Sequence, residues 1–252
     1  MSIISALCFR SITLAALALG AASPLAQADP IIDQGWDYLL TDPTGTSFAG
    51  VAFQGVPLNV FDFGPPYGVQ PVGDTDTIVH RLAPVTVPVT PGTAAPIPIE
   101  LVSLNLRSVS QTDFGAGLGY YYISLQSARG GPASVGQMTI TFDDPDSGTF
   151  GSFFDVYFDI RFGALNGPIV LSSNLLLSST GSPWSRTPPA GAVLVDGVNN
   201  RLNGVDTSAD FWPGRIVETH PTGAQHTASS TPAPGAAGLG AIVGVFAARR
   251  RR

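Results

Sequence analysis

The sequence predicts an all-β domain, an antiparallel β-sandwich or jelly roll, with an N-terminal signal helix and a short C-terminal transmembrane helix. Three observations predict this class. Apolar residues alternate at every second position in short runs between 29 and 219, and Gly, Pro, Asp and Asn separate those runs. No segment outside the two ends has ten residues of helical periodicity. With 29 Gly and 22 Pro among 252 residues, 44% of them apolar, the chain is loop-rich and long enough for one sizeable core.

The clearest predicted strand has apolar side chains on one face and polar side chains on the other. The apolar face consists of Phe154, Val156, Phe158, Ile160 and Phe162, and the polar face of Asp155, Tyr157, Asp159 and Arg161. We expect the first face to lie in the core and the second to meet water. The runs 121–125 and 138–142 repeat this alternation, and turn-rich stretches separate the three runs, which predicts an antiparallel meander.

Further strands are predicted at 36–41, 47–54, 77–82, 97–106, 169–177 and 191–195. In 97–106 the apolar phase changes at Leu101, which predicts either a β-bulge or burial on both faces of the strand. Eight or more short strands with turns between them are typical of a two-sheet sandwich or a jelly roll. The domain is expected to span 29–219, and the polar, Ala-, Ser- and Thr-rich residues 220–231 to form a flexible linker.

The charge distribution excludes one class of partner. Every basic residue is Arg, and Arg10 and the four at 249–252 lie in the two terminal segments. The remaining seven Arg face 18 acidic residues, which gives the body a net charge of −11. Such a surface repels nucleic acid. The single cysteine, Cys8, lies in the N-terminal segment, so we expect no disulfide, catalytic thiolate or cysteine-bound metal in the mature chain.

The N-terminal residues 1–28 have the three parts of a secretory signal peptide. Arg10 precedes an apolar run from Ile12 to Ala22, and the small residues Ala26 and Ala28 flank a cleavage point for signal peptidase. Cleavage is expected after Ala28. The alternative is a buried N-terminal helix.

The C-terminal residues 232–252 have the order of a membrane anchor. Pro232, Ala233 and Pro234 precede an apolar stretch that ends at Ala248, and Arg249, Arg250, Arg251 and Arg252 follow. As a helix, the 15 residues 234–248 span roughly 22 Å, less than the hydrocarbon core of about 30 Å. The positive-inside rule predicts that the arginines stop the helix in the cytoplasm and leave the acidic body outside it.

Residues 232–252 resemble the PEP-CTERM sorting signal of Gram-negative bacteria, which combines a Pro-x-Pro motif, a short transmembrane helix and a terminal Arg cluster. Ala233 stands where the family usually has Glu. The resemblance implies transient anchoring in the inner membrane and processing by an exosortase, a membrane-embedded cysteine transpeptidase-like enzyme. It also implies delivery to the cell surface or to an extracellular matrix rich in exopolysaccharide. The alternative is a simple tail anchor that is never cut.

Asp143, Asp144 and Asp146 lie in one turn and are the candidate metal ligands of the sequence. No cofactor is expected, and Ca²⁺ is the alternative because clustered hard oxygen donors suit this ion. Their spacing does not match an EF-hand loop, and Asp-Pro-Asp-Ser-Gly also favours a plain turn without an ion. Both interpretations stay open.

Tyr120 and Tyr122 are the candidate ligand-contacting residues. Of three consecutive tyrosines in a strand at least one must point outward, and aromatic rings stack on sugar faces. Aromatic residues are also ordinary strand formers. No Gly-x-Ser-x-Gly elbow accompanies His80 to suggest a catalytic serine. The expected function is therefore non-enzymatic, that of a surface or matrix protein associated with exopolysaccharide. The alternative is a secreted carbohydrate-binding module or a glycoside-active hydrolase on a jelly-roll scaffold.

Overall fold

The computed structural model describes residues 31–42, 45–187, 211–221 and 223–230, and the backbone of 201–202 and 205–206. Within these residues the chain is almost entirely antiparallel β-structure, and its one helical element is the short 3-10 turn η1 (Gln126–Arg129). The predicted all-β antiparallel class is confirmed. The predicted signal helix, transmembrane helix and strand at 191–195 lie outside the described residues. In the part of the chain that is described, no helix is both long and apolar enough to cross a membrane.

The strands have the following bounds: β1 (Ile31–Ile32), β2 (Gly35–Thr41), β3 (Ser47–Phe48), β4 (Val51–Gly55), β5 (Asn59–Asp62), β6 (Val69–Gly73), β7 (Thr77–Arg81), β8 (Val85–Thr86), β9 (Gly92–Thr93), β10 (Ile97–Leu104), β11 (Leu106–Ser108), β12 (Tyr121–Leu125), β13 (Ser134–Asp144), β14 (Ser147–Phe162), β15 (Ile169–Ser185), β16 (Arg201–Leu202), β17 (Val205–Asp206), β18 (Trp212–Pro213), β19 (Ile216–Thr219) and β20 (Gln225–Ser230).

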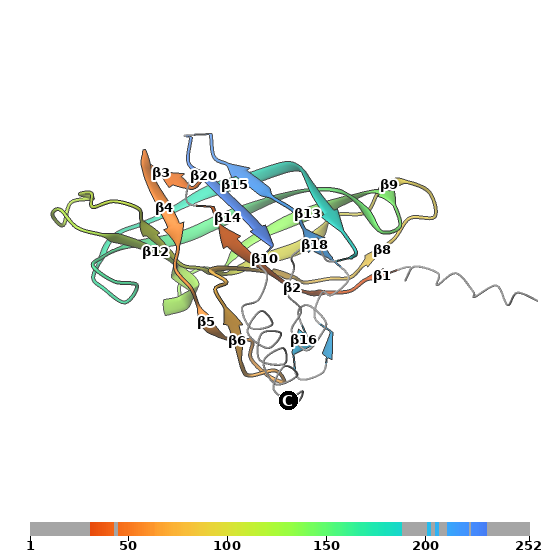
Figure 1. Ribbon diagram of the computed structural model, residues 1–252, viewed down its shortest axis with the longest axis horizontal. Coiled ribbons are helices and arrows are strands. Elements are labelled where there is room, and N and C mark those ends of the chain that lie inside the picture. Colours follow the sequence, from red (N-terminus) through yellow and green to blue (C-terminus); the bar gives the residue numbers. More distant parts are fainter. Residues whose placement is uncertain are drawn as a thin grey trace, which may run out of the picture.

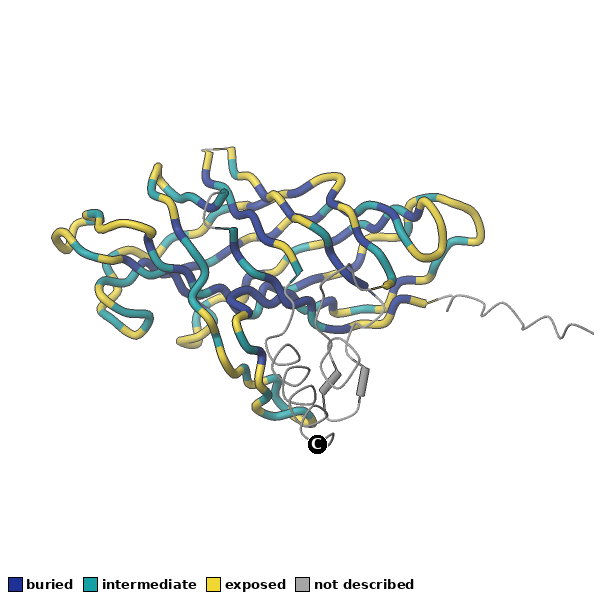
Figure 2. The backbone as a smooth tube through the Cα atoms, in the orientation of Figure 1, coloured by how far each residue is buried: buried dark blue, intermediate teal, exposed yellow. Residues whose placement is uncertain are grey.

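The principal sheet has 14 strands and makes up most of the body of the protein (Figure 1). Its pairings lead from β14 through β12, β11, β4, β3, β20, β2, β7, β10 and β13 back to β14. β13 pairs with both β10 and β14, while β20 pairs with β2, β3 and β19. The sheet therefore folds over onto itself and encloses one main core, to which nearly all of its strands contribute. Buried segments run through the middle of the body and exposed ones gather at the loops (Figure 2).

The predicted meander of 121–125, 138–142 and 154–162 is wrong in its pairing. β14 pairs with β15 along one edge, and along its other edge first with β13 and then with β12. β12 and β13 consequently lie one after the other beside the same long strand instead of beside each other. The turn η1 and the residues after it carry the chain from one to the other.

The alternation predicted for 154–162 is confirmed on its apolar face. Phe154, Val156, Phe158 and Ile160 are each at most 2% exposed. The prediction that the other face meets water fails at Asp159, which is 0% exposed. Side chains from η1 and β15 cover this carboxylate, and neither can be anticipated from the alternation of β14 alone.

The segment 47–54, predicted as one strand, is a tight hairpin of β3 and β4. Ala49 and Gly50 form its two-residue turn and both have positive φ, 50° and 77°. Two consecutive positive φ values are the signature of a type I′ turn, which matches the twist of the strands that it joins.

Both arrangements predicted from the phase change at Leu101 occur, namely a β-bulge and burial on both faces of the strand. The β10–β7 register shifts between Leu101 and Ser103, so a bulge keeps Leu104 in the main core. Val102 packs instead in a second apolar cluster with residues such as Tyr38 and with side chains of the β5–β6 hairpin. That hairpin projects from one side of the body (Figure 1).

The predicted flexible linker 220–231 is wrong, and so is the domain boundary at 219. Gln225–Ser230 form β20, which joins β19 to β2 and closes the circuit of strands. The segment is polar and small, yet Thr227 and Ala228 are 0% and 1% exposed. Hydrogen bonds between Thr227 and Thr46 satisfy the buried polar groups, so a strand can form here without large apolar side chains.

Candidate functional site

A row of four outward-facing side chains crosses the strands β4, β11, β12 and β14. Arg107 pairs across the sheet with Gln54 on one side and Tyr122 on the other, and Tyr122 pairs in turn with Arg161. Because neighbouring strands lie about 4.8 Å apart and paired residues share a face, the four side chains form a continuous row. The strand neighbours that point the other way are buried: Phe53, Leu106, Ile123 and Ile160.

The three consecutive tyrosines divide between core and surface. Tyr121 is 0% exposed, and its hydroxyl donates a hydrogen bond of 2.7 Å to the carbonyl of Gly117. Tyr122 is half-buried on the outer side of β12, and Tyr120 is 39% exposed. The structure therefore places both candidate ligand-contacting residues on the outer side of the sheet and gives the middle tyrosine a role in packing.

Arg107 lies beside Tyr120, with its Cζ atom 5.1 Å from the centre of the ring. This distance allows a cation–π interaction. The Nε atom of Arg107 is buried without a hydrogen-bond partner, and no carboxylate among the described residues pairs with the guanidinium. The two Nη groups of Arg107 also make no hydrogen bond to a described residue, so these groups, and not the buried Nε, retain donor capacity for an oxygen-rich ligand. We call Gln54, Arg107, Tyr120, Tyr122 and Arg161 the tyrosine–arginine face.

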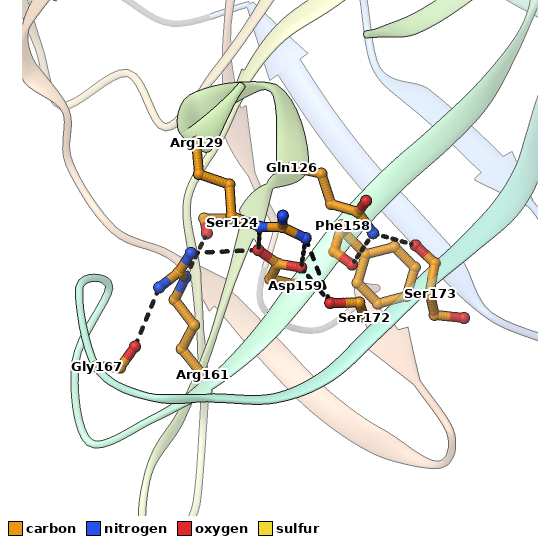
Figure 3. A network of polar contacts seen from close by, with 9 residues as sticks. All are labelled: Ser124, Gln126, Arg129, Phe158, Asp159, Arg161, Gly167, Ser172 and Ser173. Carbon is orange, nitrogen blue, oxygen red and sulfur yellow. Dashed lines mark hydrogen bonds and ion pairs between the residues drawn. The ribbon is translucent and has the colours of Figure 1, made fainter. Parts of the chain in front are cut away.

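A polar network adjoins this face and fixes Arg161 (Figure 3). Asp159 accepts hydrogen bonds from Nε and Nη2 of Arg129 (2.5 and 3.0 Å), from Nη2 of Arg161 (3.2 Å) and from the hydroxyl of Ser172 (2.7 Å). Arg161 also donates to Ser124 Oγ at 3.2 Å. The hydrogen bonds from Arg129, followed by that from Ser172 and the charges of both arginines, hold the pKa of Asp159 below its usual value despite burial.

The electrostatics of this side differ from those of the body as a whole. Arg107, Arg129 and Arg161 supply three positive charges, and Asp159 supplies one negative charge that two of them share. The face and its network thus carry a net charge of +2 in a body whose net charge is −11. Asp159 is ionised and its oxygens are occupied, so it supports the arginines instead of acting as an acid or a base.

The three aspartates proposed as calcium ligands lie at the β13–β14 hairpin and serve its turn. Asp144 accepts hydrogen bonds from the Ser147 hydroxyl (2.8 Å) and the Asp146 amide (2.7 Å), which lower its pKa in that order. Asp146 pairs with Arg186 at 3.4 Å. Nowhere in the described ranges do three or more His, Cys, Asp or Glu side chains gather in a way that could hold a metal ion. The geometry of this turn therefore gives calcium binding by Asp143, Asp144 and Asp146 no support.

The remaining predicted site residues lie outside the described residues. They are Ala26 and Ala28 at the signal cleavage point, Pro232, Ala233 and Pro234 of the sorting motif, and Arg249, Arg250, Arg251 and Arg252 of the anchor stop.

Arg107 is the residue of this site that sequence reasoning missed. Its position in a short apolar alternation, between Leu106 and Ser108, marks it as outward-facing, but its lack of an acidic partner is visible only in the folded chain. Comparisons of the chain with protein-family models, curated proteins and solved structures found no match.

Proposed function

We propose that the protein is an exported, non-enzymatic protein of the cell surface or extracellular matrix, whose β-sandwich body contacts polysaccharide through the tyrosine–arginine face. One observation carries the proposal for the body. Two outward tyrosines lie next to Arg107, whose guanidinium has no acidic partner among the described residues.

The chemistry of the face suits sugars. Tyrosine rings offer apolar surfaces on which sugar rings can stack, and Arg107 and Gln54 offer hydrogen-bond donors for hydroxyl or carboxylate groups. The row extends across four strands, which matches the extended shape of a polymer. A binding role fits better than hydrolysis because the buried carboxylate beside the face, Asp159, is held by two arginines and Ser172.

The proposed route to the surface rests on the order of elements in the two ends of the chain. Signal peptidase removes residues 1–28, the segment 234–248 anchors the chain transiently in the inner membrane, and an exosortase processes the tail at or near Pro232–Pro234. The body then lies outside the cytoplasm, where it meets exopolysaccharide.

Replacing Tyr122 with Ala is expected to weaken binding of exopolysaccharide several-fold, because a stacking surface is lost. Replacing Arg107 with Gln should weaken binding of an acidic polysaccharide such as alginate about tenfold or more, because a charged donor is lost. Affinity electrophoresis in gels that contain alginate or neutral dextran measures both effects. Arg186→Gln is the matched control, since Arg186 follows β15 at the opposite end of β14 from Arg161 and pairs with Asp146. Unchanged mobility of both face variants in every polysaccharide would refute the proposed site.

The intact mass of protein released from the surface of the native host tests the sorting route. We expect the N-terminus at Asp29 and a C-terminus that lacks the four arginines of the tail. Substitution of Ala for both Pro232 and Pro234 should leave the chain in the membrane fraction with the tail attached. Recovery of wild-type surface protein that still ends in Arg252 would show that the tail is not processed.

A further inference from the structure

Two adjoining cavities lie inside the folded sheet, and the strands that carry the tyrosine–arginine face on their outer side line the larger one with their inner side. The larger, of about 40 Å³, is bounded mainly by apolar side chains such as Phe53, Ile123 and Val156. The smaller, of about 20 Å³, is bounded by apolar residues together with Asp37, Ser152 and Glu218. Leu104, Leu177 and His226 line both of them.

Glu218 and His226 bring polar atoms to this apolar interior. They are direct cross-strand partners on β19 and β20, and they are 6% and 7% exposed. Residues paired in this way have Cβ atoms about 5 Å apart on the same face of the sheet. Glu218 accepts a hydrogen bond of 3.2 Å from Ser152 Oγ. Both ring nitrogens of His226 are buried and have no hydrogen-bond partner among the described residues.

The histidine is the group at the cavities in which every hydrogen-bonding atom is unused. Native interiors satisfy nearly all buried polar atoms, and an unsatisfied one is usually matched by an internal water or a ligand. Asp37, the other ionisable group at the smaller cavity, is paired with Arg81 at 3.2 Å. Burial raises the pKa of Glu218 to about 7 and lowers that of His226 to about 4. At pH 6 both groups are therefore neutral, and the imidazole offers one donor and one acceptor.

We infer that the two cavities form one binding site for a small, largely apolar molecule that carries a single neutral hydrogen-bonding head, such as a hydroxyl group. The apolar part occupies the larger cavity, and the head bonds to the ring of His226. A charged head is disfavoured because it would be buried beside a neutral Glu218 without a counter-ion. Ser47, Phe48 and Gln225, which line the larger cavity, are only half-buried and mark the side of entry.

The test uses two small probes on the purified full chain at pH 6. Xenon, which has no polar atom, should perturb the methyl NMR signals of Leu104, Leu177 and Ile123. 1-Propanol should perturb the same signals and also shift the ring ¹⁵N signals of His226. In His226→Leu the affinity for 1-propanol should fall about three- to tenfold, the effect of one hydrogen bond, while xenon binding persists.

Two further variants keep the outcome decisive. Ala224→Leu should fill the larger cavity, of which Ala224 is a lining residue, and abolish binding of both probes. His220→Leu, at a histidine that lines neither cavity, should leave both affinities unchanged. The inference is overturned if neither probe perturbs the wild-type signals, which would mean that ordered water alone fills the site. It is also overturned if His226→Leu binds 1-propanol as tightly as the wild type does.

Discussion

Replacement of Asp159 with Asn is expected to lower the free energy of unfolding by about 3 kcal/mol. The carboxylate is fully buried and joins Arg129 on η1 to Arg161 on the same strand. The neutral amide leaves the Arg161 side chain, which is 14% exposed, without its counter-charge. Arg129 is 41% exposed, so water partly screens the charge that its lost ion pair leaves behind. The expected loss of stability therefore falls at the lower end of the range for buried ion pairs. For a domain of this size, 3 kcal/mol lowers the melting temperature by roughly 6 to 12 °C.

Asp155 supplies the matched control for this substitution. It lies four positions earlier in β14, points to the same outer side and is exposed. Asp155→Asn should therefore change the free energy of unfolding by no more than about 0.5 kcal/mol. Urea unfolding at pH 7 followed by tryptophan fluorescence compares the two variants. Equal stabilities for Asp155→Asn and Asp159→Asn would show that the network in Figure 3 does not hold this part of the sheet together.

Glu218 and His226 are expected to give the stability of the domain opposite dependences on pH, which nearly cancel in the wild type. Burial raises the pKa of Glu218 from 4.5 to about 7, so the folded chain keeps a proton that the unfolded chain loses. The contribution of Glu218 to the free energy of unfolding is fully present below pH 4.5 and is lost as the pH rises to about 7. Burial lowers the pKa of His226 from 6.5 to about 4, so its contribution is present above pH 6.5 and is lost as the pH falls toward 4.

Single substitutions should reveal the pH dependence that each group gives to the free energy of unfolding. In His226→Leu the free energy of unfolding should fall by roughly 3 kcal/mol more between pH 4.5 and 7.5 than it does in the wild type, because the opposing contribution of His226 is lost while that of Glu218 remains. In Glu218→Gln it should rise by a similar amount, roughly 3 kcal/mol, between pH 4 and 6.5. Urea titrations at half-unit steps of pH measure both slopes. Parallel pH profiles for the wild type and the two variants would show that neither group changes its protonation on folding.

The strands that the sequence predicted correctly are those whose pattern is complete within a few residues. Alternation along β14 identified Phe154, Val156, Phe158 and Ile160 as core residues because successive side chains in any strand point to opposite faces. The same rule predicted that Tyr120 and Tyr122 could lie on the outside, and the structure places them there.

The features that the sequence mispredicted or missed depend on residues far away along the chain. β20 looks like a linker by composition, but β2, nearly the whole length of the domain away, supplies its hydrogen-bond partners. The alternation of β14 predicts that Asp159 faces water, but in the folded chain Arg129 and Ser172 cover it. The unused hydrogen-bonding capacity of Arg107 and of His226 likewise depends on which side chains lie around them in the folded chain.

By itself the sequence determined the all-β class, the inward and outward faces of β14 and the excess of negative charge over the body, because each follows from local periodicity or from composition. Only the tertiary structure decided that the sheet closes through β20, that one carboxylate binds two arginines, and that Glu218 and His226 share an apolar interior. Strand pairing depends on long-range contacts, and the burial of a polar group depends on all the residues that pack around it. Neither can therefore be predicted from the alternation of a single segment.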